Sequence, residues 1–106
     1  MLPTDAGHLE QMCARLYSRT DRVIGWGSGS VFDYFHGLFP IRLDYLVDND
    51  RAVWGQRRRG IEVVSPERLL SEIPKETAIV IYSSAWTEIR EQIAEIGQFA
   101  ADDDVQ

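Results

Sequence analysis

Three glycines on alternate positions separate a short apolar run from a helical pattern, and this stretch constrains the fold more than any other. The apolar run at residues 23–24 leads into Gly25, Gly27 and Gly29. A helical pattern follows at once, and a second apolar run ends at Asp48. Strand, glycine turn, helix, strand and acid are the successive parts of a βαβ unit.

Glycines in such a turn have a physical use at a phosphate site. One turns the chain sharply, the next lets a phosphate approach the backbone without a Cβ between them, and a third small residue lets the helix pack close to the strand. Gly25, Gly27 and Ser30 fit the spacing of dinucleotide-binding turns, with Ser30 in place of the third glycine. Gly25, Gly27 and Gly29 also fit the alternate-glycine pattern of S-adenosylmethionine-dependent methyltransferases. NAD and S-adenosylmethionine therefore both stay open as ligands.

An acid at the end of the second strand serves both classes, because each ligand presents ribose hydroxyls. Asp48 occupies this position, and Asn49 and Asp50 after it are expected to make the turn. An aspartate prefers a free 2′-hydroxyl and repels a 2′-phosphate, so NADP is disfavoured. Methyltransferases of this type usually carry another acid two residues before the first glycine, whereas this chain has Val23 there.

Strands alternate with helices along the rest of the chain. The apolar spacing predicts helices over residues 5–18, 30–37, 65–73 and 86–96. Apolar runs predict strands at residues 23–24, 42–47, 60–64 and 77–82. This alternation predicts an α/β fold, and right-handed crossovers give the strand order 3-2-1-4. We therefore expect a three-layer Rossmann-like domain, with a mainly parallel four-stranded sheet and helices on both faces.

At 106 residues the chain has room for one domain. We expect a lead-in helix within residues 1–20, a core over residues 21–97 and a tail over residues 98–106. The lead-in helix has an apolar stripe formed by Leu9, Met12, Cys13, Leu16 and Tyr17. The tail is typical of the approach to one more strand, so we expect the chain to be a domain of a longer protein.

Bulk properties exclude several classes of protein. The net charge of -6 argues against nucleic acid as a partner, since phosphate backbones attract basic surfaces. The single cysteine, Cys13, rules out an internal disulfide and a Cys₂His₂ zinc site, and it fits a reducing cytoplasm. No apolar run approaches the roughly 18 residues of a membrane span. We expect a cytoplasmic domain without a metal site or a signal peptide.

Polar residues outside the glycine turn leave several alternatives open. Ser83 and Ser84 follow the fourth predicted strand, where their hydroxyls can reach a ligand or cap the last helix. The run at residues 57–59 is three arginines, which can grip a phosphate or form a solvated loop. His36 is either a base or a helix-end residue favoured by the dipole. No Ser/His/Asp set and no Tyr-x-x-x-Lys pair is evident, so we expect no catalysis by this domain alone.

A series of short motifs extends this pattern over residues 21–97. They are the glycine turn at residues 24–30, the acidic turn at 46–50, the Trp-Gly pair at 54–55, the strand at 60–63 and the Ser-Pro helix start at 65–69. In this order they resemble the small Rossmann-like domains attached to bacterial sugar-modifying enzymes. Those enzymes include nucleotide-sugar acyltransferases, polysaccharide-biosynthesis epimerase/dehydratases, and methyltransferases and glycosyltransferases of envelope glycan clusters.

The resemblance implies a nucleotide or nucleotide-sugar binding module whose chemistry resides in a neighbouring domain. Trp26 departs from the relatives, which often have a small residue there; its ring would stack on a base or block the pocket. The expected ligand-binding residues are Gly25, Trp26, Gly27, Ser28, Gly29, Ser30, Asp48, Ser83 and Ser84. Two other hypotheses stay open: a fragment of a methyltransferase or NAD-dependent enzyme, and an interaction module with an empty turn.

Overall fold

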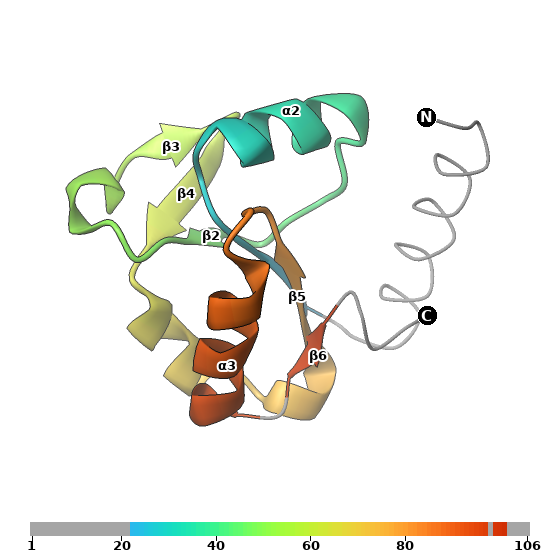
Figure 1. Ribbon diagram of the computed structural model, residues 1–106, viewed down its shortest axis with the longest axis vertical. Coiled ribbons are helices and arrows are strands. Elements are labelled where there is room, and N and C mark those ends of the chain that lie inside the picture. Colours follow the sequence, from blue (N-terminus) through green and yellow to red (C-terminus); the bar gives the residue numbers. More distant parts are fainter. Residues whose placement is uncertain (1–21, 98, 102–106) are drawn as a thin grey trace.

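A six-stranded sheet runs through the computed structural model, which describes residues 22–97 and 99–101 (Figure 1). The strands are β1 (Arg22–Trp26), β2 (Leu46–Val47), β3 (Arg57–Arg58), β4 (Ile61–Val64), β5 (Thr77–Ile81) and β6 (Ala100–Ala101). The helices are α2 (Ser30–Leu38), α3 (Trp86–Ile96) and the short 3₁₀ helices η1 (Arg51–Val53), η2 (Pro66–Ser71) and η3 (Pro74–Glu76). The predicted α/β class is confirmed, while the expected lead-in helix over residues 5–18 lies outside the described residues. None of the helices described is long and apolar enough to cross a membrane.

The sheet is larger and more mixed than the sequence predicts. Its strands lie in the order β3-β4-β2-β1-β5-β6, and all neighbours are parallel except β3 and β4, which are antiparallel. The expectation of four strands is therefore incomplete, because β3 and β6 add one strand at each edge. β3 consists of two arginines, which carry no apolar strand signal, so the pattern placed it in a loop.

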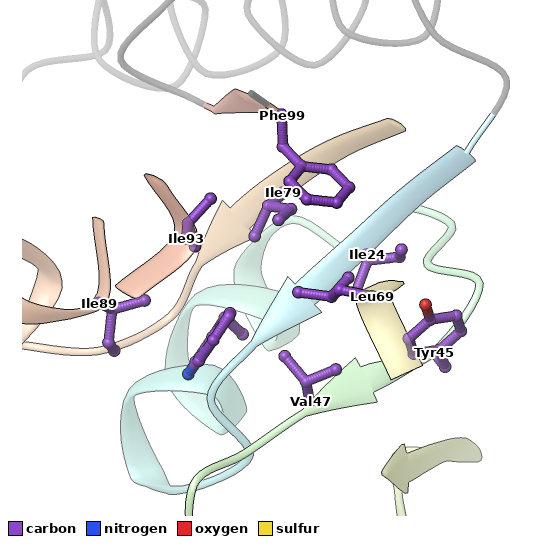
Figure 2. Packing of buried hydrophobic residues seen from close by; sticks show 9 residues of the cluster. Ile24, Tyr45, Val47, Leu69, Ile79, Ile89, Ile93 and Phe99 are labelled. Carbon is purple, nitrogen blue, oxygen red and sulfur yellow. The ribbon is translucent and has the colours of Figure 1, made fainter. Parts of the chain in front are cut away.

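Alternate residues of each strand face opposite sides of the sheet, and this builds two apolar clusters. On one side Val23 of β1 belongs to a cluster with Phe32 of α2. On the other side Ile24 belongs to a cluster with Ile89 and Ile93 of α3, shown in Figure 2. Helices thus cover both faces, because the central strands β1, β2 and β5 carry apolar side chains on both sides.

The apolar spacing of Val31, Tyr34, Phe35 and Leu38 predicts the buried face of α2, and this prediction is wrong for most of the stripe. The residues that α2 buries are Phe32 and His36, while Tyr34 and Leu38 of the expected stripe are 64% and 55% exposed. Each residue of a helix turns the direction of its side chain by about 100°. Most of the expected stripe therefore lies on an exposed flank of the helix, whereas Val31 is half-buried and packs against the cluster that contains Phe32.

The later helices are closer to expectation. α3 runs from Trp86 to Ile96 as predicted, with Gly97 at its C-cap. The Ser-Pro helix start is also confirmed, since the Ser65 side chain accepts a hydrogen bond from the backbone N–H of Glu67. The segment that follows is the 3₁₀ helix η2 rather than an α-helix, and it ends at Ser71.

At the amino end of β1, a cluster of polar side chains closes the sheet. Arg22 donates two hydrogen bonds to Glu72, at 3.1 and 3.0 Å, and the Tyr45 hydroxyl donates a third at 2.8 Å. Burial raises the pKa of Tyr45, and its bond to Glu72 raises it further. Burial alone would raise the pKa of Glu72, but the bonds from Arg22 and Tyr45 outweigh it and hold that pKa below its ordinary value. We call Arg22, Tyr45 and Glu72 the amino-end cluster.

Candidate functional site

A hollow of about 390 Å³ lies at the opposite end of the sheet, beyond the carboxyl ends of β1, β2 and β5. This volume is in the range of small-molecule pockets. It is lined by Trp26, Gly27, Ser28, Gly29, Ser30, Val31, Asp48, Asn49, Tyr82, Ser83, Ser84, Ala85, Glu88, Ile89 and Gln92. Every residue that the sequence predicts for the site lines it, apart from Gly25.

The three glycines of the turn have different roles. Gly27 has a φ of +112°, and a Cβ there would lie 2.2 Å from the backbone oxygen of Tyr82, so only glycine fits. Gly25 is buried within β1, and a Cβ there would lie 2.6 Å from Leu46 Cδ2, so its role is packing. A Cβ on Gly29 would meet nothing within 4 Å, so the backbone is open at this point.

Trp26 is the last residue of β1 and does not stand in the turn. Its side chain is 1% exposed and belongs to the apolar cluster that contains Ile24, Val47 and Ile89. The ring therefore forms a wall of the hollow and contributes to the core. Stacking on a base requires an exposed ring face, which a residue buried to this degree does not offer.

Asp48 ties the end of β2 to the glycine turn. Its Oδ2 accepts hydrogen bonds from the backbone N–H of Ser28 at 3.0 Å and from the Ser28 hydroxyl at 2.8 Å. Its Oδ1 accepts from the backbone N–H of Asp50 at 2.8 Å. Because a carboxylate has about four acceptor positions, Asp48 retains acceptor capacity for a ligand hydroxyl. Ser28 itself is 3% exposed, so its hydroxyl acts mainly on Asp48.

Two helices begin at the hollow without a side-chain cap. α2 begins after Gly29 and α3 begins after Ala85, and neither N-cap residue makes a side-chain cap hydrogen bond. The first backbone N–H groups of a helix have no partner within the helix and carry a partial positive charge. Both sets of N–H groups therefore border the same hollow, where they favour an anionic or oxygen-rich ligand.

Ser83 and Ser84 do not cap α3, so the capping alternative is wrong. The N-cap residue is Ala85, and its backbone N–H donates to the Ser83 hydroxyl at 3.0 Å. Ser83 thus shapes the turn between β5 and α3. Both serines line the hollow.

Seven lining residues are missing from the site that the sequence predicts, and three of them, Asn49, Glu88 and Gln92, have carboxylate or amide side chains. Glu88 and Gln92 lie one helical turn apart on α3, a spacing that brings side chains to the same side. Their position on the helix that follows Ser83 and Ser84 is a sequence signal that they face the same site. Among the lining residues, the charged side chains are the carboxylates Asp48 and Glu88. A phosphate in the hollow would therefore be met by backbone N–H groups.

The arginine run joins the β3–β4 turn to α2 and does not line the hollow. Arg58 pairs with Asp33 of α2, and Arg59 Nε donates to His36 Nδ1 at 3.1 Å. Because Arg59 is a donor, Nδ1 must accept, and His36 Nε2–H donates to the carbonyl of Ile41 at 2.9 Å. Both ring nitrogens are thus engaged in packing α2, and neither reaches the hollow.

The described residues contain no group of three or more His, Cys, Asp or Glu side chains that could hold a metal ion. Comparison of the chain with models of protein families, with curated proteins and with solved structures gives no match.

Proposed function

We propose that the chain is a Rossmann-like module that binds a nucleotide or a nucleotide-sugar in the hollow. The observation that carries the proposal is the glycine turn and two uncapped helix N-termini at the carboxyl ends of β1 and β5. The chain leaves β1 towards β2 on one side, and β5 pairs with β1 on the other. In open α/β sheets, ligands bind in the crevice where the strand order reverses in this way.

The phosphate and the ribose of a nucleotide each have matching groups in the hollow. The N–H groups that open α2 and α3 suit the phosphate, since the helix dipoles favour negative charge there. The carboxylates of Asp48 and Glu88 suit ribose or sugar hydroxyls, which are hydrogen-bond donors. The same carboxylates repel a 2′-phosphate, so NADP remains disfavoured.

The parent protein in this proposal belongs to bacterial polysaccharide biosynthesis, and its reaction, such as a transferase step, occurs in a neighbouring domain. The support is the series of motifs over residues 21–97, together with the lining of the hollow. Serine, carboxylate and amide side chains line the hollow. His36, the candidate base, is instead hydrogen-bonded to Arg59 and Ile41 and does not reach the hollow. A cytoplasmic location, where nucleotide-sugars are made, follows from the same proposal.

The test is a titration followed by NMR with a UDP-sugar, NAD and S-adenosylmethionine. Binding should shift backbone signals of residues 27–30, 48 and 83–85, with the arginine run at 57–59 unaffected. Shifts with S-adenosylmethionine alone would identify a methyltransferase fragment instead. No shift with any ligand at millimolar concentration would refute the proposal.

A second candidate function is an interaction module, and the exposed flank of α2 favours it. Tyr34, Phe35 and Leu38 are 64%, 46% and 55% exposed, and the rings of Tyr34 and Phe35 meet edge to face at 5.1 Å. Adjacent exposed aromatic and aliphatic side chains are typical of surfaces that bind another protein segment. If this flank mediates assembly, Leu38→Glu should abolish concentration-dependent association in sedimentation experiments. A wild-type chain that stays monomeric at every concentration would contradict it.

A further inference from the structure

A reciprocal pair of amide side chains spans the hollow between β2 and α3. Asn49 Nδ2 donates to Gln92 Oε1 at 3.0 Å, and Gln92 Nε2 donates back to Asn49 Oδ1 at 2.9 Å. Both residues line the hollow, and the pair joins segments 43 residues apart in the chain. It is exposed to solvent, so its bonds exchange readily with water and opening it costs little.

We infer that the Asn49–Gln92 pair is the subsite for the base of the ligand, an inference that rests on the proposed nucleotide function. A primary amide presents a donor beside an acceptor in one plane. Purine and pyrimidine bases present the complementary edge, and asparagine and glutamine bind such an edge with two hydrogen bonds. In the reciprocal pair, each amide already satisfies this pattern with the other. A base therefore replaces one partner without leaving a polar group unpaired.

The order of groups along α3 fits this assignment. The helix rises about 1.5 Å per residue, so Ala85 and Gln92 are separated by roughly 10 Å along the axis. The uncapped N-terminus after Ala85 suits the phosphate, and Glu88 between the two suits the ribose hydroxyls. The far end at Gln92 is then left for the base. Asp48 and Asn49, which directly follow β2, have the same order, with the acid first.

The pair explains a preference that the glycine turn cannot produce. Backbone N–H groups at a helix start bind any phosphate ester, whatever is attached to it. Two amide side chains at the opposite end favour ligands with a planar donor–acceptor edge, which they bind with two hydrogen bonds at once. The subsite thus distinguishes a nucleotide from a sugar phosphate.

The experiment compares three probes, AMP, UMP and ribose 5-phosphate, on the full chain and on Gln92→Leu. Leucine is close to glutamine in size and suits an exposed helix position, but it makes no hydrogen bond. We expect Gln92→Leu to weaken AMP or UMP binding about tenfold and to leave ribose 5-phosphate unchanged. Gln56→Leu is the matched control, because Gln56 is exposed and does not line the hollow. In the wild type, the side-chain amide signals of Asn49 and Gln92 should shift with AMP or UMP only.

The possible outcomes separate the two proposals. If all three probes bind the wild type equally and Gln92→Leu changes nothing, the nucleotide-phosphate function stands and the base subsite is overturned. If no probe binds the wild type, the proposed function fails and the subsite fails with it. Loss of affinity for ribose 5-phosphate in Gln92→Leu would also overturn the subsite, since the residue would then act on the whole hollow.

Discussion

The two ends of the sheet treat their polar groups in opposite ways. At the amino end, Arg22 and Tyr45 direct their donors at Glu72, and the cluster is closed by its own hydrogen bonds. At the carboxyl end, α2 and α3 begin without side-chain caps around a hollow of about 390 Å³. At the amino end the polar groups therefore bond to one another and stabilise the fold. At the carboxyl end, backbone donors remain directed at a space that a ligand can fill.

The carboxyl end also has internal hydrogen bonds, and Asp48 accepts several of them. Two of its contacts run to Ser28, in the glycine turn, so the acid holds the turn in place before any ligand arrives. Preorganisation of this kind reduces the ordering that binding would otherwise require. The open site therefore has internal hydrogen bonds of its own, and those between Asp48 and Ser28 lie where the end of β2 meets the glycine turn.

The largest effect should come from Gly27→Ala, which tests the geometry of the open end. The φ of +112° disfavours any side chain, and the new Cβ would lie 2.2 Å from a backbone oxygen of Tyr82. Strain and overpacking together should lower the free energy of unfolding by about 4 kcal/mol, measured by urea denaturation.

Gly29→Ala is the matched control for this change. A Cβ there meets nothing within 4 Å, so the loss should be at most about 1 kcal/mol, the effect of a weaker N-cap residue. Equal destabilisation by the two substitutions would contradict the different roles assigned to these glycines.

Glu72→Ala should have the next largest effect, at the closed end. It leaves the buried Tyr45 hydroxyl without its acceptor and Arg22 without its bidentate partner. We expect a loss of about 2 kcal/mol in the free energy of unfolding, with ligand binding at the other end unchanged. Glu67→Ala, an exposed glutamate of η2, should cost less than about 0.5 kcal/mol. A similar loss for both would show that the amino-end cluster contributes little.

Low pH should destabilise the amino-end cluster of the wild-type protein. The pKa of Glu72 is lower in the folded chain than its ordinary value of 4.5, so the folded state binds this proton less readily than the unfolded state. The stability that Glu72 contributes is present above pH 4.5 and is lost as the pH falls through its folded pKa. Urea denaturation at pH 7, 4.5 and 3 should show this fall, and Glu72→Gln should reduce it. An unchanged pH dependence in Glu72→Gln would contradict the assignment.

Apart from the control substitutions, Ser28→Ala should have the smallest effect. It removes the hydroxyl bond to Asp48 but keeps the backbone bond from residue 28. We expect a loss of about 1 kcal/mol in the free energy of unfolding. If Asp48 binds ribose, the freed acceptor should leave nucleotide affinity within a few-fold of the wild type in calorimetry. Complete loss of binding would mean that Ser28 contacts the ligand directly.

The sequence predicted the parts of the site that depend on backbone geometry. Gly27 and Asp48 were found because a sharp strand-to-helix turn and an acid after the next strand leave clear local signals. The long helix from Trp86 to Ile96 was found because its isoleucines repeat with the period of a helix. These features are set by neighbours along the chain, so a pattern of residues is enough to identify them.

The features that were missed depend on contacts between distant segments. Asn49 and Gln92 are 43 residues apart, and nothing local indicates that their amides meet. The face of α2 was assigned wrongly because its longest apolar stripe is exposed, while His36 is buried against Phe32. A polar residue becomes a core residue only when partners such as Arg59 satisfy it, and those partners come from elsewhere in the fold.

The short antiparallel strand β3 has a consequence for how the protein behaves at high concentration. An exposed sheet edge is a template on which foreign strands can add. At this edge of the sheet, β3 is two residues long and consists of Arg57 and Arg58. Arg58 also forms a salt bridge with Asp33 of α2. Charge and brevity together discourage a second chain from extending the sheet at this border. The domain is thus protected against aggregation through this edge of the sheet.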